Sequence, residues 1–158
     1  APGLAIATLG PGATNLATGV GNAWLDRSPM IAITCNLNTD QLGRRLQMYI
    51  DHHKLFEPIT KATLPISIGS VADTVAEAIS IALSEPAGPV HLDLPEDVAL
   101  SEATEEVPQK WELNKIELAA KKQLVSSFDV LKKARRPIAV LGSNSMRIGN
   151  IDNLTINR

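Results

Sequence analysis

The sequence predicts an α/β fold in which a parallel sheet is flanked by helices. Short apolar segments of strand length alternate with longer segments in which apolar residues recur every three or four positions. This alternation is typical of parallel sheets whose strands are connected through helices. Gly and Pro cluster between the segments, where they interrupt regular structure. The chain has 158 residues, 44% of them hydrophobic, which is enough for a folded domain with a substantial core.

The first predicted unit is a strand, a helix and a second strand. Residues 4–9 are mostly apolar and are typical of a buried strand, as are residues 30–34. Between them, apolar residues at helical spacing predict a helix over residues 13–25. Gly19 and Gly21 are poor helix formers, so we expect this helix to pack closely against a neighbour.

The later elements follow the same alternation. Residues 35–56 have no clear period, and such long irregular segments are usually functional or form interfaces. Ser70, with Asp73 three residues later, is expected to cap a helix. The predicted elements are an edge strand over 63–68, a helix over 71–83, a strand over 90–94, a polar linker over 96–113, a helix over 116–134 and a strand over 137–141.

Composition and charge argue against several functional classes. With 15 basic and 17 acidic residues the net charge is -2, so the chain lacks the basic excess typical of nucleic-acid binding. No apolar run approaches the ~20 residues of a membrane-spanning helix. Cys35 is the single cysteine, which rules out an internal disulfide and fits a reducing compartment. We therefore expect a cytoplasmic protein with neither nucleic-acid nor membrane partners.

The turn formed by Gly10, Pro11 and Gly12, called the Gly-Pro-Gly turn below, is the most informative local motif. Glycines permit a sharp turn, and the N-terminus of the following helix favours a negatively charged ligand. However, Asn15 stands where a dinucleotide-binding fingerprint has Gly, and no Gly-Lys-Ser/Thr follows as in a P-loop. The residues alone leave open a phosphate-binding turn and a purely structural one.

Histidines and the cysteine give weaker signals. His52 and His53 are adjacent, which is poor spacing for metal ligands, and we expect them to be solvated or to lie at an interface. His91 alternates with apolar residues in a predicted strand, so we expect it to be half-buried. No partner for a nucleophilic Cys35 is evident, and a small core residue is the favoured interpretation.

Two clusters of charged residues have side chains that can bind a ligand. Arg44 and Arg45 have the chemistry to bind an anion, but paired loop arginines are more often solvated. Asp93, Glu96 and Asp97 gather at a predicted strand end, where carboxylates can ligate a divalent ion. The proline between them favours a structural exit from the sheet instead.

Several short motifs occur in a specific order along the chain. They are residues 8–16 (TLGPGATNL), Asp26 and Pro29, residues 58–61 (PITK), residues 88–90 (GPV) and residues 93–98 (DLPEDV). This series resembles the N-terminal, pyrimidine-binding domain of thiamine-diphosphate enzymes related to acetolactate synthase, which include pyruvate oxidases and decarboxylases. The resemblance implies a thiamine-diphosphate-binding fold with its N-terminal part missing. Its implied divisions are a partial pyrimidine-binding domain over 1–98, a linker over 99–115 and the start of the family's middle domain over 116–158.

The resemblance implies a set of residues at the aminopyrimidine end of thiamine diphosphate. By position, these are Gly10, Pro11, Gly12, Asn15 and Met48. Two positions in this region depart from the family. Leu9 stands where the family commonly has Ser, and Met48 stands where it has a Gln in the pocket. A thioether cannot donate a hydrogen bond. The departures leave open a relative that uses another 2-oxo acid or acyl acceptor.

No catalytic residue is assigned within these 158 residues. In the family, the activating glutamate lies upstream of the first strand, and the diphosphate and Mg²⁺ bind a separate domain with a Gly-Asp-Gly motif. We therefore expect an internal piece of a longer protein that is inactive alone. The resemblance implies that the parent makes or breaks a carbon–carbon bond in a small 2-oxo acid, using thiamine diphosphate and Mg²⁺, as a homodimer or tetramer.

Two other interpretations remain open. One is a Rossmann-like nucleotide-binding or non-catalytic regulatory module, against which Asn15 and the lack of an acidic residue after strand 30–34 both count. The other is a degenerate family member kept as a structural subunit, for which Leu9 and Met48 are the hints.

Overall fold

The computed structural model describes residues 1–103, 105, 106, 121–138, 140 and 142. The chain forms two compact units, Ala1–Ile116 and Glu117–Arg158. The first unit contains the sheet and every candidate cofactor-facing residue.

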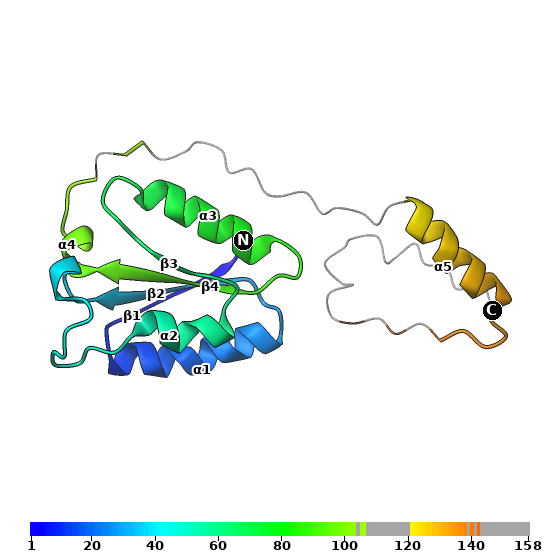
Figure 1. The fold of residues 1–158 in the computed structure, drawn as a ribbon, viewed down its shortest axis with the longest axis horizontal. Coiled ribbons are helices and arrows are strands. Elements are labelled where there is room, and N and C mark those ends of the chain that lie inside the picture. Colours follow the sequence, from blue (N-terminus) through cyan, green and yellow to red (C-terminus); the bar gives the residue numbers. More distant parts are fainter. Residues whose placement is uncertain (104, 107–120, 139, 141, 143–158) are drawn as a thin grey trace. The chain divides into compact units, whose positions relative to one another are not determined.

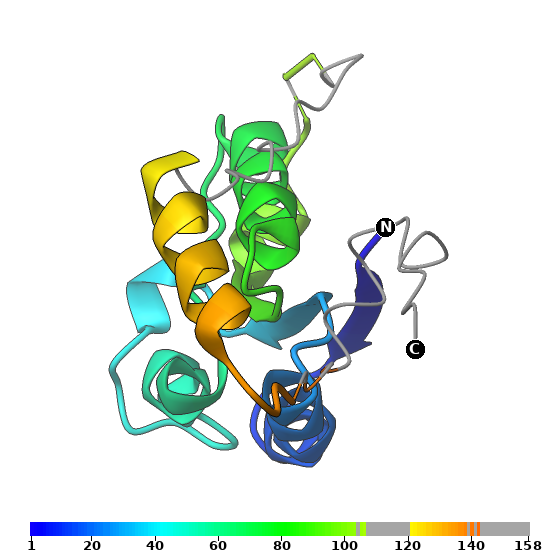
Figure 2. The same cartoon turned by 90° about the vertical axis from the view of Figure 1, so that its right-hand side faces the viewer.

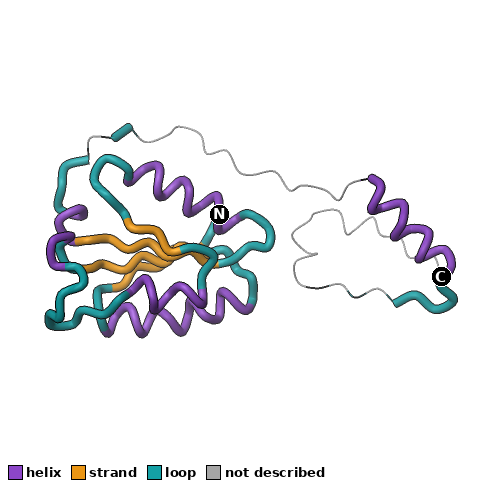
Figure 3. The backbone as a smooth tube through the Cα atoms, in the orientation of Figure 1, coloured by secondary structure: helices purple, strands orange, loops and turns teal. Residues whose placement is uncertain are grey.

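The first unit is built on a parallel sheet of four strands in the order β1-β2-β4-β3 (Figures 1 and 3). Its strands are β1 (Gly3–Ala7), β2 (Met30–Asn36), β3 (Thr63–Pro65) and β4 (Pro89–Pro95). The register places Ile31 opposite both Leu4 and Val90. The α/β fold with a parallel sheet and flanking helices is confirmed.

Helices cover both faces of the sheet (Figure 2). On one face lie α1 (Pro11–Leu25) and α2 (His52–Phe56), and on the other lies α3 (Val71–Leu83). Two 3₁₀ helices, η1 (Thr39–Gln41) and η2 (Glu57–Ile59), and the short helix α4 (Glu96–Ala99) complete the unit. Connections between parallel strands are right-handed. The β1-to-β2 and β3-to-β4 connections run in opposite directions across the sheet. Their helices therefore lie on opposite faces.

The alternation of side chains along the strands divides the core in two. Ile31, Val90 and Leu92 point to the α3 face, where they pack with Ala78 and Ala82 of the helix. A second cluster on the α1 face contains Ala13, Val20, Ala32 and Phe56. The helix α3 that packs on the first cluster spans residues 71–83, as its periodicity predicts.

The prediction that residues 4–9 form a buried strand is wrong in one respect. The strand forms, but Leu4 is 66% exposed and Ile6 64% exposed, because β1 is an edge of the described sheet and α3 packs over the other strands. Apolar composition identifies a strand without showing what covers it. The close packing expected at Gly19 and Gly21 is also absent from the described residues, since an added Cβ there would meet nothing within 4 Å.

The ends of α3 are capped by charged residues that lie far away in the sequence. Ser70 makes no side-chain cap, contrary to the prediction. Instead, Glu105 accepts hydrogen bonds from the backbone N–H groups of Val71 (3.0 Å) and Ala72 (2.7 Å). At the other end, the Lys61 Nζ donates to the carbonyls of Ile81 and Ser84. Each charge has the sign that stabilises its end of the helix dipole.

The second unit contains α5 (Lys121–Lys133), which lies within the predicted helix over 116–134. Residues 116–120 lie outside the described residues. The predicted strand over 137–141 does not appear at residues 137, 138 and 140, while 139 and 141 lie outside the described residues. Leu124, Phe128 and Leu131 form an exposed apolar row along α5.

Candidate functional site

The candidate site lies at the carboxyl ends of β2 and β4, which are neighbours in the sheet. The chain leaving β2 passes to α2 on the α1 face, whereas the chain leaving β4 enters α4, whose Val98 packs in the α3-face core. In open parallel sheets, ligands bind where neighbouring strands send their connections to opposite faces. The Gly-Pro-Gly turn follows β1 at the same edge.

The Gly-Pro-Gly turn has a backbone conformation that requires glycine. Gly10 has φ 60° and ψ -112°, and it directly precedes α1. A Cβ on Gly10 would lie 2.4 Å from the carbonyl oxygen of Met48. Met48 itself has a positive φ of 63°. The fold thus brings Met48 against the turn, and both residues have a positive φ there.

The residues expected to face a cofactor are gathered here, and several present free surface. Pro11 and Asn15 are exposed in the first turns of α1, and Met48 is 46% exposed. Gly10 is buried and shapes the turn. The exposed residues carry no charge, so they fit an uncharged heterocycle better than a diphosphate. Their contact with a cofactor stays a prediction.

His52 lies under the Gly-Pro-Gly turn, and the expectation that it is solvated is wrong. It is 1% exposed, whereas its neighbour His53 is exposed. Its Nε2 accepts a hydrogen bond from the Gly10 N–H at 3.3 Å, and its Nδ1 lies 2.9 Å from Thr34 Oγ1 and 3.3 Å from Asp93 Oδ1. The spacing of His52 and the buried Phe56 on one helix face was the signal that sequence reasoning missed.

The hydrogen-bond directions in this buried network follow from its one fixed donor. A backbone N–H can only donate, so Nε2 of His52 is unprotonated and the neutral ring carries its proton on Nδ1. That proton is donated to Thr34 Oγ1, beside Asp93. The Thr34 hydroxyl is then free to donate to Nε2 of His91, at 2.8 Å.

His91 is fully buried, not half-buried as expected. Its ring stacks on Phe56 with centroids 4.3 Å apart, and its Nδ1 has no hydrogen-bond partner among the described residues. Burial lowers the pKa of His91 to about 4, an effect that the neighbouring Asp93 carboxylate partly opposes. His91 is therefore neutral at physiological pH.

Of the three acidic residues that could ligate a metal ion, Asp93 and Asp97 have other partners and Glu96 is exposed. Asn36 Nδ2 donates to both Asp93 oxygens, at 3.0 and 2.9 Å, and so ties β2 to β4. Asp97 accepts from the backbone and hydroxyl of Thr39, and the hydroxyl bond lowers the Asp97 pKa. Over the described parts of the chain, no group of three His, Cys, Asp or Glu side chains is placed to hold a metal ion.

The other residues considered from sequence lie apart from this network. Cys35 is a partly buried free thiol near the end of β2. Arg44 and Arg45 are exposed in the loop before Met48. Neither observation indicates a nucleophile or a built anion site.

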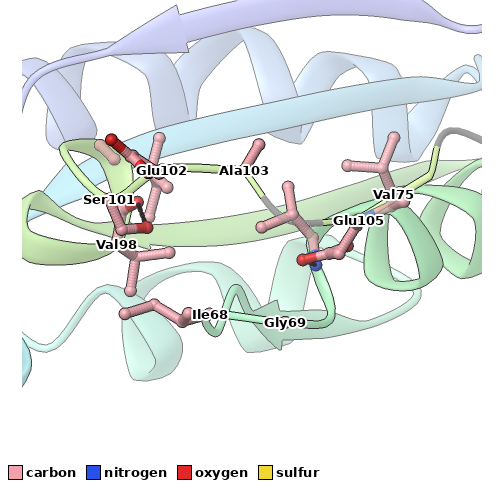
Figure 4. A pocket seen from close by; sticks show the side chains of 12 residues that line it. Ile68, Gly69, Val75, Val98, Ser101, Glu102, Ala103 and Glu105 are labelled. Carbon is pink, nitrogen blue, oxygen red and sulfur yellow. Dashed lines mark hydrogen bonds between the residues drawn. The ribbon is translucent and has the colours of Figure 1, made fainter.

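A separate cavity of about 490 Å³ lies on the α3 face, between α3 and α4 (Figure 4). It is lined mainly by apolar side chains, among them Ile68, Val75 and Val98. Its Glu105 carboxylate is already engaged by the N-terminus of α3. This cavity therefore offers little to orient a polar cofactor.

Comparison with known protein families gives a match over the first third of the chain, which holds the Gly-Pro-Gly turn but not β4. Residues 1–56 match the thiamine pyrophosphate (thiamine diphosphate) enzyme family, N-terminal TPP binding domain. This range includes the Gly-Pro-Gly turn, Asn15, Met48 and His52.

Similar proteins are described as large subunits of acetolactate synthase. The chain is 35% identical over 154 residues to a probable acetolactate synthase large subunit of Methanococcus aeolicus, covering 93% of this chain and 26% of the relative. It is 33% identical to the corresponding probable subunit of Methanocaldococcus jannaschii (96% and 27% covered) and 30% identical to the acetolactate synthase large subunit of Lactococcus lactis (95% and 27%). The chain thus spans about a quarter of the length of these relatives.

None of the described helices has both the length and the apolar character needed to cross a membrane.

Proposed function

We propose that this chain, which belongs to the thiamine-pyrophosphate enzyme family and matches its N-terminal domain over residues 1–56, forms the aminopyrimidine side of a thiamine-diphosphate site. The parent protein is then a carboligase or decarboxylase of small 2-oxo acids, like acetolactate synthase. One observation carries this proposal: the family match covers Gly10 and Met48, and the fold brings these two residues into contact.

In this proposal each residue has a limited role. Gly10 and Gly12 shape the turn, Pro11 and Asn15 contact the cofactor's pyrimidine end, and Met48 forms a wall of its pocket. The rigid turn and its uncharged exposed residues fit this role. When bound, thiamine diphosphate supplies an electron sink for making or breaking a carbon–carbon bond next to a carbonyl.

The remaining features of the parent are proposed from the family resemblance. Mg²⁺ and the diphosphate bind a domain other than the one described here, and active sites form between subunits of a cytoplasmic homodimer or tetramer. Residues 1–98 form part of the pyrimidine-binding domain, 99–115 a linker and 116–158 the start of a middle domain. The division into units at residues 116 and 117 supports this last boundary.

Cofactor binding by the full-length protein tests the function. We expect thiamine diphosphate with Mg²⁺ to bind saturably in calorimetric titration and pyruvate to be consumed, while NAD and ATP do not bind. Binding of a nucleotide without thiamine diphosphate would favour a Rossmann-like module instead. We expect no pyruvate turnover by the 158-residue chain alone, and turnover above a cofactor-free blank would contradict this.

A pair of asparagines on one helix tests the placement of the site. Asn15 and Asn22 are both exposed on α1, but Asn22 donates to Asp26 at the far end of the helix. We expect Asn15→Ala to weaken thiamine-diphosphate binding by about 3- to 10-fold, the effect of one hydrogen bond, and Asn22→Ala to leave it unchanged. Equal affinities of the two variants would exclude Asn15 from the site.

A further inference from the structure

His52 joins three segments that meet at the candidate site. Its ring contacts the Gly10 backbone before α1, Thr34 on β2 and Asp93 on β4. The ring is completely buried, and Asp51 caps the start of its short helix by accepting from the Lys54 N–H at 3.0 Å. A buried imidazole that spans three segments is placed to fix their relative positions.

The Gly-Pro-Gly turn depends on partners outside α1. No side chain among the described residues caps the start of the helix, and Pro11 at its first position has no N–H. Gly10 is held in a conformation that only glycine adopts readily, with Met48 packed against it. The buried Gly10 N–H donates to Nε2 of His52. Without that acceptor, a buried donor would be left unpaired, which is costly.

The Nδ1 side of the ring also has polar partners, Thr34 and Asp93. Nδ1–H donates toward Thr34 Oγ1, and the adjacent Asp93 carboxylate is held by Asn36 Nδ2. The ring is consequently confined from both sides, and the proton on Nδ1 leaves Nε2 available to the turn.

We propose that His52 is a positioning residue that holds the Gly-Pro-Gly turn in its cofactor-binding conformation. It acts through the Gly10 amide and touches no reacting atom. This role rests on the proposed function, because the turn is taken to face thiamine diphosphate. The expected consequence of losing the Nε2 acceptor is weaker cofactor binding, with the fold retained.

Two substitutions separate the two sides of the ring. His52→Gln retains an acceptor near the position of Nε2, whereas His52→Asn retains a donor near Nδ1 and leaves the Gly10 N–H unpaired. In the full-length protein, we expect the Asn variant to bind thiamine diphosphate about tenfold more weakly, while the Gln variant stays within about threefold of wild type. Equal affinities of the two variants would overturn the proposal.

Two further measurements separate the effect on cofactor binding from an effect on folding: urea unfolding of the variants and NMR of the wild-type protein. Urea unfolding of both variants shows whether a difference in affinity follows a difference in stability, and an affinity loss that tracks stability would indicate a merely structural role. In wild-type protein, ¹⁵N NMR should find Nε2 of His52 unprotonated and Nδ1 protonated. A proton on Nε2 would overturn the proposal even if a variant fails to fold. Absence of thiamine-diphosphate binding by wild type would contradict the proposed function, while the NMR result still decides the role of His52 in holding the turn.

Discussion

At the scale of single residues, the site depends on the direction of a few buried hydrogen bonds. The Gly10 N–H fixes the tautomer of His52, and His52 in turn fixes the hydroxyl of Thr34. The last member, His91, accepts from Thr34 through Nε2, and its Nδ1 has no partner in the part of the chain that the structure describes. Protonation of His91 at Nε2 would displace the hydrogen bond that this nitrogen accepts from Thr34.

His91 should make the protein sensitive to acid. Its pKa is about 4 in the folded protein against an ordinary value of 6.5, so the unfolded chain takes up the proton first as the pH falls. We expect the free energy of unfolding to drop by up to about 3 kcal/mol between pH 6.5 and 4, with no further loss from this group at lower pH. Urea unfolding across this pH range measures the effect.

His91→Gln should remove most of this pH dependence, since glutamine does not titrate. The control is His53→Gln, which removes an exposed histidine and should keep the dependence of wild type. An unchanged pH profile in the His91 variant would show that another group is responsible.

At the scale of elements, the ends of the helices are stabilised by residues distant in sequence. Glu105 and Lys61 cap the two ends of α3, and Met48 packs on the turn before α1. Lys61 loses solvent at this position, and its burial lowers its pKa. A helix-capping role thus accounts for the lysine of the PITK motif.

The turn before α1 should not tolerate a side chain. Gly10→Ala would both strain a positive φ and place a Cβ 2.4 Å from the Met48 carbonyl. Gly43 has a positive φ of 79° but open space around it, so Gly43→Ala measures the strain alone. We expect losses of unfolding free energy of about 3 kcal/mol or more for Gly10→Ala and about 1 kcal/mol for Gly43→Ala. Similar losses in thermal or urea unfolding would show that the contact with Met48 relaxes easily.

At the scale of the whole first unit, the two central strands have the most pairing partners in the described sheet. β2 and β4 each pair on both sides, whereas β1 and β3 pair on one side each. The exposed Leu4 and Ile6 of β1 add less to the core than their apolar character suggests.

Hydrogen exchange should follow this arrangement. We expect the amides of Ile33 and Leu92 in the central strands to exchange at rates set by global unfolding, and the amide of Ile6 to exchange faster because it lies in an edge strand of the described sheet. Exchange followed by mass spectrometry or NMR on the 158-residue chain measures this difference. Equally slow exchange at Ile6 would show that β1 is covered, which the same measurement on the full-length protein can locate.

Much of the fold was accessible from sequence because it depends on local pattern. Periodicity predicted α3 with its observed bounds, apolar runs located β1, β2 and β4, and a weak alternation over 63–68 located β3, which is shorter. The burial of His52 and His91 was not predicted, because adjacent or alternating histidines look alike whether solvated or enclosed. The cap on α3 was missed because its carboxylate comes from a segment more than thirty residues away, as the separation of 34 between Val71 and Glu105 shows.

The sequence by itself determined the α/β class, the order of elements and the motif that introduces α1, since these depend on the spacing of apolar residues and on Gly and Pro. Only the tertiary structure decided that Met48 lies against Gly10 and that His52 accepts a hydrogen bond from the Gly10 N–H. These contacts join segments that no local periodicity relates. They form because the ends of parallel strands meet at one edge of the sheet, where buried polar groups must find partners in one another.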